Sequence, residues 1–191
     1  MPSMNRALFV RFALPFALPV LAGLGAPEAL AAPGCTLTSF DSVVDFGAMR
    51  PTSTGGATEF RPSPMRRTLS ATCPDAAQMS VGFQGQVKDA SQLKFGDKGA
   101  YTVRVTSARL DGETVQLARL QSAGAPPTAA PSGDLTLQPS DLFAPVSGQQ
   151  LLSGKHLDIT LEIAPVIPMD AVRINQEVAL DAIMKLQLIT P

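Results

Sequence analysis

The sequence predicts an all-β protein. Apolar and polar residues alternate with a period of two in several runs, and glycine, proline, aspartate and serine separate these runs. The most regular run places four apolar residues on one face, namely Leu157, Ile159, Leu161 and Ile163. Only residues 171–182 admit a helix, and the second half of this segment alternates better than it repeats at 3.6 residues.

The other expected strands follow in order along the chain. The first two lie at 35–49 and at 67–73, and the second continues into 79–83. Tyr101, Val103 and Val105 share one face of the next strand. Asp111-Gly112 is a hairpin turn signal, and it predicts pairing of residues 103–110 with residues 114–117.

Residues 1–31 have the features of an export signal. Arg6 and Arg11 form the positive region, residues 12–24 are apolar, and Ala29-Leu30-Ala31 is a small-residue cleavage site. A membrane anchor is the alternative, but the apolar run is shorter than the roughly 20 residues that a spanning helix needs, and it contains two prolines. A lipoprotein signal ending at Cys35 is a further alternative, although Ala32-Pro33 fits it poorly.

Cys35 and Cys73 are the only cysteines. An exported chain meets an oxidising compartment, so we predict an intramolecular disulfide between them, with buried free thiols as the alternative. Closing this loop lowers the conformational entropy of the unfolded chain, which stabilises the folded state by roughly 4 kcal/mol. The two Cα atoms should then lie about 4.4–6.8 Å apart.

Residues 32–191 have the length of one domain with a sizeable core. Removing Arg6, Arg11 and Glu28 from the 15 basic and 16 acidic residues leaves 13 and 15, a net charge of −2 without clusters. This pattern argues against a nucleic-acid partner. The Pro/Ala/Gly-rich segment 121–134 is expected to be a flexible loop within this domain, and a split into two domains near residue 125 is the alternative.

Residues that carry chemistry are scarce, so we expect neither an enzyme nor a cofactor. His156 is the single histidine, and no Gly-x-Ser-x-Gly motif accompanies it. With both cysteines paired, a transition-metal site lacks ligands, and the aspartates show no calcium-loop spacing. Tryptophan is absent, so the nine phenylalanines are expected to fill the core.

Three features together resemble the chaperone–usher fimbrial subunits. A cysteine follows the export signal, Val43-Val-Asp-Phe-Gly47 ends the first strand, and Leu69-Ser-Ala-Thr-Cys73-Pro-Asp supplies the second cysteine. Residues 93–112 are similar to an exported, fimbrial-like branch of that family. Spore-coat-U-like domains share the cysteine and Phe-Gly features and are the nearest alternative.

The resemblance implies an immunoglobulin-like, pilin-type β-sandwich that lacks its last strand. A periplasmic chaperone, and later a neighbouring fimbrial subunit, would supply that strand by strand addition, and an usher would assemble the fibre. The expected location is the periplasm, then the cell surface or the medium, with no stable membrane span after signal cleavage. The competing hypothesis is a self-contained secreted β-sandwich that binds a ligand or, less favoured, catalyses hydrolysis.

The C-terminal strand is the expected site for the partner strand. One apolar face alternates with Glu177, Asp181, Lys185 and Gln187. An ordinary core strand would show the same pattern. In the resembling subunits the chaperone also clamps the terminal carboxylate, which Pro191 carries here, although Thr190 replaces the usual tyrosine. The partner-binding residues are therefore expected to be Val178, Leu180, Ala182, Met184, Leu186, Leu188 and Pro191.

The segment before Cys35 bears on a role in a fibre. After cleavage at Ala31, only Ala32, Pro33 and Gly34 precede Cys35. Three residues reach about 10 Å, whereas a donor strand needs about ten residues. We therefore expect a subunit that accepts a strand but does not donate one, either at a fibre tip or outside any polymer.

Overall fold

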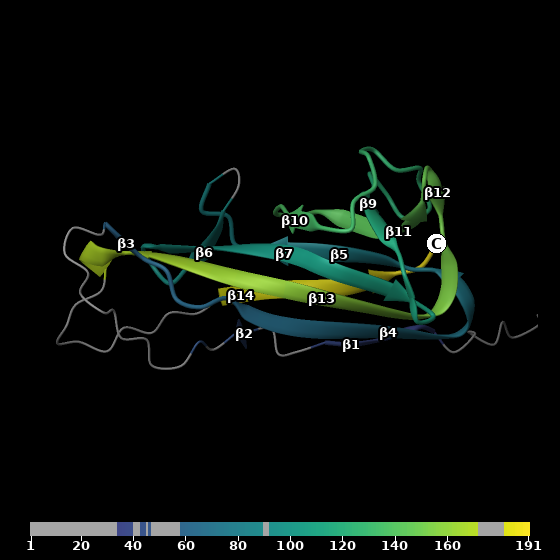
Figure 1. Cartoon of the computed structure of the whole chain (residues 1–191), viewed down its shortest axis with the longest axis horizontal. Coiled ribbons are helices and arrows are strands. Elements are labelled where there is room, and N and C mark those ends of the chain that lie inside the picture. Colours follow the sequence, from purple (N-terminus) through teal and green to yellow (C-terminus); the bar gives the residue numbers. More distant parts are fainter. Residues whose placement is uncertain (1–33, 40–42, 45, 47–57, 90–91, 172–181) are drawn as a thin grey trace, which may run out of the picture. The chain divides into compact units, whose positions relative to one another are not determined.

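The computed structural model describes residues 34–39, 43–44, 46, 58–89, 92–171 and 182–191 (Figure 1). Within them the chain forms 14 strands, all paired antiparallel, and one short 3-10 helix, Met169–Ala171. The all-β class is therefore confirmed. The strands are β1 (Thr36–Thr38), β2 (Val43–Val44), β3 (Glu59–Phe60), β4 (Met65–Gln78), β5 (Ser80–Gly85), β6 (Leu93–Phe95), β7 (Gly99–Leu110), β8 (Glu113–Thr114), β9 (Gln116–Arg119), β10 (Leu135–Leu137), β11 (Leu142–Ser147), β12 (Gln150–Leu151), β13 (Ser153–Pro168) and β14 (Ala182–Ile189).

The longest strand, β13, organises one part of the sheet, which we call the β13 section. Its strands follow in the order β1, β4, β13 and β7, and the far edge of β7 pairs with β10 and β8. β3 pairs with the end of β13. The predicted export signal and all but the two end residues of the helix alternative at 171–182 lie outside the described residues; Ala171 ends the 3-10 helix and Ala182 begins β14.

The second part of the sheet, the β14 section, consists of β14, β5, β11 and β9 in that order, with β2 on β14 and β12 on β11. β6 pairs with both β7 and β14 and so connects the two sections. Only Met79 separates β4 from β5, so the chain passes directly from one section into the other. In the view of Figure 1, β14 and β5 run behind β13 and β7.

One hydrophobic core collects residues from both sections. The alternation predicted from sequence is confirmed, because the expected inward residues of β4, β5, β7 and β13 are buried while their neighbours face out. Burying a large apolar side chain contributes about 1.5–3 kcal/mol before entropy is counted. The largest fully buried side chains include Tyr101, Phe83, Phe95, Phe143, Leu69, Ile159 and Leu161.

The predicted hairpin at Asp111-Gly112 is confirmed for its first residue pairs. β7 and β8 join there, and both turn residues have positive φ, 50° and 88°, as this turn type requires. The chain beyond β8 behaves differently from the expectation. β9 leaves β7 and pairs with β11, because Leu117 is buried in the shared core opposite Pro145.

The Pro/Ala/Gly-rich segment 121–134 contains no strand in the structure. It is nevertheless attached to the edge of β9. The amide of Leu117 donates to the carbonyl of Ser132 at 2.8 Å, and the amide of Ser132 donates back at 2.9 Å. The amide of Thr128 also donates to the carbonyl of Arg119 at 2.9 Å. The segment thus covers backbone groups of β9 that would otherwise form an open edge.

Candidate functional site

The site predicted at the C-terminal strand falls on β14. Ala182 and Met184 are buried, Leu186 and Leu188 are half-buried, and Lys185 faces solvent. The predicted alternation is therefore present from residue 182 onward. Val178 and Leu180 lie outside the described residues, and Pro191 is exposed.

One edge of β14 is occupied by β5, and the direction of the hydrogen bonds can be derived. The amide of Phe83 donates to the carbonyl of Asp141 at 2.8 Å, on the side of β11. In an antiparallel strand the N–H and C=O of one residue point to the same side, and successive residues point to opposite sides. Gly82 and Gln84 therefore bond towards β14, where they are opposite Gln187 and Lys185.

The same rule fixes the other edge of β14. Since Lys185 and Gln187 bond to β5, the backbone groups of Met184, Leu186 and Leu188 point away from β5. In the described residues, no strand pairs with that edge between Met184 and Ile189. We call this stretch the open edge.

The beginning of the same edge is closed by the chain itself. Ala182 pairs with both Phe95 of β6 and Val44 of β2, which must lie on opposite sides of it. β6 is joined to β5 by a hydrogen bond from the amide of Lys94 to the carbonyl of Gln86 at 2.7 Å. β2 therefore lies on the edge away from β5, immediately before the open edge.

The predicted disulfide lies close to this region. Cys35 and Cys73 are bonded, and their Cα atoms are 4.2 Å apart, just below the expected range. The bond attaches the short strand β1 to β4. β1 also approaches β14, and the side chain of Leu37 is half-buried against the same core as Leu186. Half-buried apolar side chains near the open edge thus come from both β1 and β14.

A buried tyrosine holds the start of β14. The hydroxyl of Tyr101 donates to the carbonyl of Ile183 at 2.9 Å. Burial raises the pKa of Tyr101 to about 12, because the phenolate would lose its hydration. Its ring packs edge-to-face with that of Phe95 at 6.3 Å. Sequence reasoning placed Tyr101 on one face of a strand with Val103 and Val105 but did not identify this link to β14.

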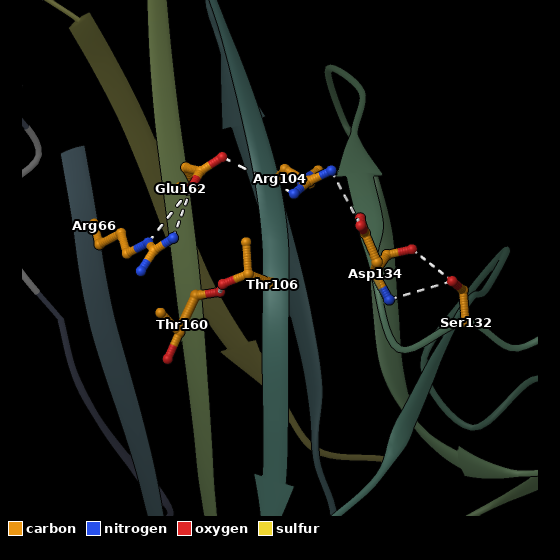
Figure 2. Close-up of polar contacts among 7 residues, drawn as sticks. All are labelled: Arg66, Arg104, Thr106, Ser132, Asp134, Thr160 and Glu162. Carbon is orange, nitrogen blue, oxygen red and sulfur yellow. Dashed lines mark hydrogen bonds and ion pairs between the residues drawn. The ribbon is translucent and has the colours of Figure 1, made fainter. Parts of the chain in front are cut away.

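The outer face of the β13 section carries a polar network that the sequence did not predict (Figure 2). Glu162 lies between Arg66, at 3.4 Å, and Arg104, at 4.0 Å. Arg104 continues to Asp134 at 3.1 Å, and Asp134 in turn accepts from the hydroxyl of Ser132 at 2.6 Å through its carbonyl. The charges alternate across β4, β13 and β7, so the row is neutral and stabilises the strand pairing weakly.

His156, the single histidine, lies on the same outer face beside a bulge of β13. Its Nδ1 is 3.2 Å from the hydroxyl of Thr72. The carboxylate of Asp111 accepts from the backbone amides of His156 and Lys155 at 2.8 and 2.9 Å. These bonds lower the pKa of the Asp111 carboxyl below its usual value. The carboxylate is thereby engaged in fixing the backbone bulge.

Within the described residues, no group of acidic, histidine or cysteine side chains is arranged to hold a metal ion. No helix in those parts of the chain has the length and hydropathy to cross a membrane. Comparison of the chain with protein-family models, with curated proteins and with solved structures gives no match.

Proposed function

We propose that this chain is an exported fimbrial-type structural or adhesive subunit that accepts a β-strand from another polypeptide along the open edge of β14. The observation that supports the proposal most directly is the one-sided pairing of Met184–Ile189, which bond only to β5 among the described strands. Strand addition to a sheet edge is a common mode of peptide recognition.

The open edge offers both parts of such an interaction. Three residues, Met184, Leu186 and Leu188, direct an N–H and a C=O outward, which supplies six backbone groups for a partner strand. The side chains of Leu186 and Leu188 are only half-buried and gain burial when a strand covers them. Affinity would come from the backbone bonds, and register from the alternating apolar side chains.

The partners in this proposal are a periplasmic chaperone with its usher, followed by a neighbouring fimbrial subunit. An exposed strand edge beside apolar side chains promotes aggregation, so a chaperone that covers it has a clear physical purpose. The proposal keeps the expectation that the chain accepts a strand without donating one.

Co-purification with the cognate chaperone tests the proposal. Leu186→Asp and Leu188→Asp place charges on the apolar side of the open edge, and we expect each to reduce recovery of the complex at least tenfold. Met184 is less suitable, because it is only 2% exposed and its replacement would damage the core.

Two controls accompany these variants. Gln187→Asp changes an exposed side chain on the same strand, and Gln138→Asp changes an exposed residue far from it in sequence. Both should retain wild-type recovery. Equal recovery of the leucine variants and the controls, at equal thermal stability, would reject strand addition at this edge.

A self-contained secreted binding protein is the second candidate. It is favoured by β2, which already pairs with Ala182 and Ile183 and so closes part of the edge from within the chain. This alternative predicts a stable, soluble monomer when the chain is exported without a chaperone. A fimbrial subunit should instead be degraded or aggregate under the same conditions.

A further inference from the structure

Pro191 lies close to a segment distant in sequence. Ile189 pairs with Ser80 of β5, and Pro191 follows it. A Cβ atom built on Gly124 would lie 3.5 Å from the Cβ of Pro191, which is ordinary van der Waals contact. Gly124 belongs to the Pro/Ala/Gly-rich segment, so this segment passes close to Pro191.

The burial of Ser80 indicates that this end of the sheet is covered on its outer side. Val81 and Phe83 face the core, so the neighbouring Ser80 and Gly82 face outward. Ser80 is nevertheless 1% exposed, and its hydroxyl has no hydrogen-bond partner in the described residues. The Cδ1 atom of Ile189 lies 3.5 Å from the Cβ position of Gly82, so Ile189 contributes to this cover.

The segment that reaches Pro191 is anchored on both sides. Before it, the amide of Leu120 donates to the carbonyl of Leu142 at 2.8 Å. After it, Thr128 bonds the carbonyl of Arg119 through its amide and its hydroxyl, at 2.9 and 3.1 Å. Between these anchors the chain turns at Gly124, whose φ of 77° suits glycine. Residues 121–127 therefore form an arch fixed at both ends.

We propose that this arch, residues 121–127, is a strap that holds the C-terminal residues 189–191 against the β14 section. The strap would keep the last residues of β14 paired with β5 when no partner is bound. In Figure 1 the C-terminus lies at the same end as β9, β11 and β12, to which the anchors of the strap belong.

The strap has a consequence for partner binding, and this consequence rests on the proposed function, whereas the strap itself does not. A partner that covers the ring of Pro191 on this side must first displace residues 121–127. A strand that adds beside Leu186 and Leu188 need not do so. The end of β14 would then be accessible to a partner only after residues 121–127 move, whereas Leu186 and Leu188 would be accessible without that movement.

A designed disulfide tests the contact. The Cβ separation of 3.5 Å lies within the range of disulfides, so the double variant Gly124→Cys/Pro191→Cys should oxidise to a cross-link faster than the control does, even though the φ of 77° at Gly124 disfavours cysteine there. The matched control is Gly133→Cys/Pro191→Cys, because Gly133 belongs to the same segment and has nothing within 4 Å of its Cβ position. Peptide mapping after oxidation measures the cross-linked fraction of both variants. Cross-linking of the control at an equal rate, or of neither variant, would overturn the proposal.

Hydrogen exchange provides a second test that needs no partner, so its failure is distinct from failure of the proposed function. Replacing residues 123–127 with Gly-Gly should remove the strap but keep its anchors. We expect the amides of Gln187 and Ile189, which bond to β5, to exchange at least tenfold faster, with β13 unchanged. Unchanged exchange at these amides would contradict the strap. If exchange in β13 also rises, the variant has lost global stability, and the cross-linking result decides.

Discussion

β13 and β14 carry the same alternating pattern but bury it to different extents. In β13, Ile159, Leu161 and Ile163 are all 0% exposed, whereas Leu186 and Leu188 of β14 are half-buried. β13 pairs with β4 on one edge and β7 on the other, while among the described strands Met184–Ile189 pair only with β5. The burial of an alternating strand therefore depends on what occupies both of its edges, which the pattern itself does not contain.

The largest difference between the two strands should appear on truncation of a leucine. Leu161→Ala should lower the free energy of unfolding by about 2–5 kcal/mol, because it leaves a cavity in the core. Leu188→Ala removes a half-buried side chain and should cost about 1 kcal/mol. Urea unfolding measures both. Equal losses would mean that Leu188 is fully covered in solution and that the edge is not open.

Proline substitutions sharpen the comparison between the two edges of β14. Gln187→Pro removes an N–H that bonds to β5, whereas Leu188→Pro removes one that points to the open edge. The first variant should be less stable than the second by about 1–3 kcal/mol, since it leaves the half-buried carbonyl of Gly82 unpaired. Thermal melts of the two variants test this order, and the reverse order would show that the hydrogen-bond directions are wrong.

Alkaline pH should loosen the start of β14 through Tyr101. The folded-state pKa of about 12 lies above the usual tyrosine pKa of 10.0, so the unfolded chain releases the proton first as the pH rises. The stabilisation is fully present below pH 10 and is lost as the pH approaches 12, by on the order of 1–3 kcal/mol. Tyr101→Phe should remove this part of the pH dependence and cost about 1 kcal/mol at neutral pH. Unfolding curves at pH 9 to 12 compare the two proteins; identical slopes would contradict the burial of the Tyr101 hydroxyl.

The smallest effect is expected on the outer face of β13. Glu162→Gln removes the charge between Arg66 and Arg104 and should cost about 0.5 kcal/mol, with the difference vanishing in high salt. Asp75→Asn is the control, because the side chain of Asp75 is 97% exposed in its pair with Lys155. A loss above about 2 kcal/mol for Glu162→Gln would show that this row of charges contributes more to stability than exposed ion pairs usually do.

Much of the local structure could be predicted from the sequence. Alternation is a local signal, so the inward residues of β4, β5, β7 and β13 were identified correctly, and the disulfide followed from export and cysteine count. The turn at Asp111-Gly112 was recognisable because two positive φ angles in succession favour these residue types.

The pairing of distant strands could not be predicted in the same way. Which strand lies beside β14 depends on β5 and β2, and nothing in residues 182–189 encodes their identity. The contact of Gly124 with Pro191 and the row through Glu162 join segments far apart in the chain. The residues of one segment are enough to predict which face of the sheet a side chain occupies. The residue that pairs with it across a strand edge can be identified only from the folded structure.

The pairing of β14 with β5 sets the order in which the chain can fold. Leu186 is opposite Phe83, so the intervening chain of roughly 100 residues must be closed before these strands meet, and such non-local closure slows folding. During synthesis from the N-terminus, β4, β7 and β13 emerge before β14. Until β14 emerges, β11 can cover only one edge of β5 and the edge that faces β14 is unpaired, so the nascent chain is most vulnerable to aggregation and proteolysis in this interval.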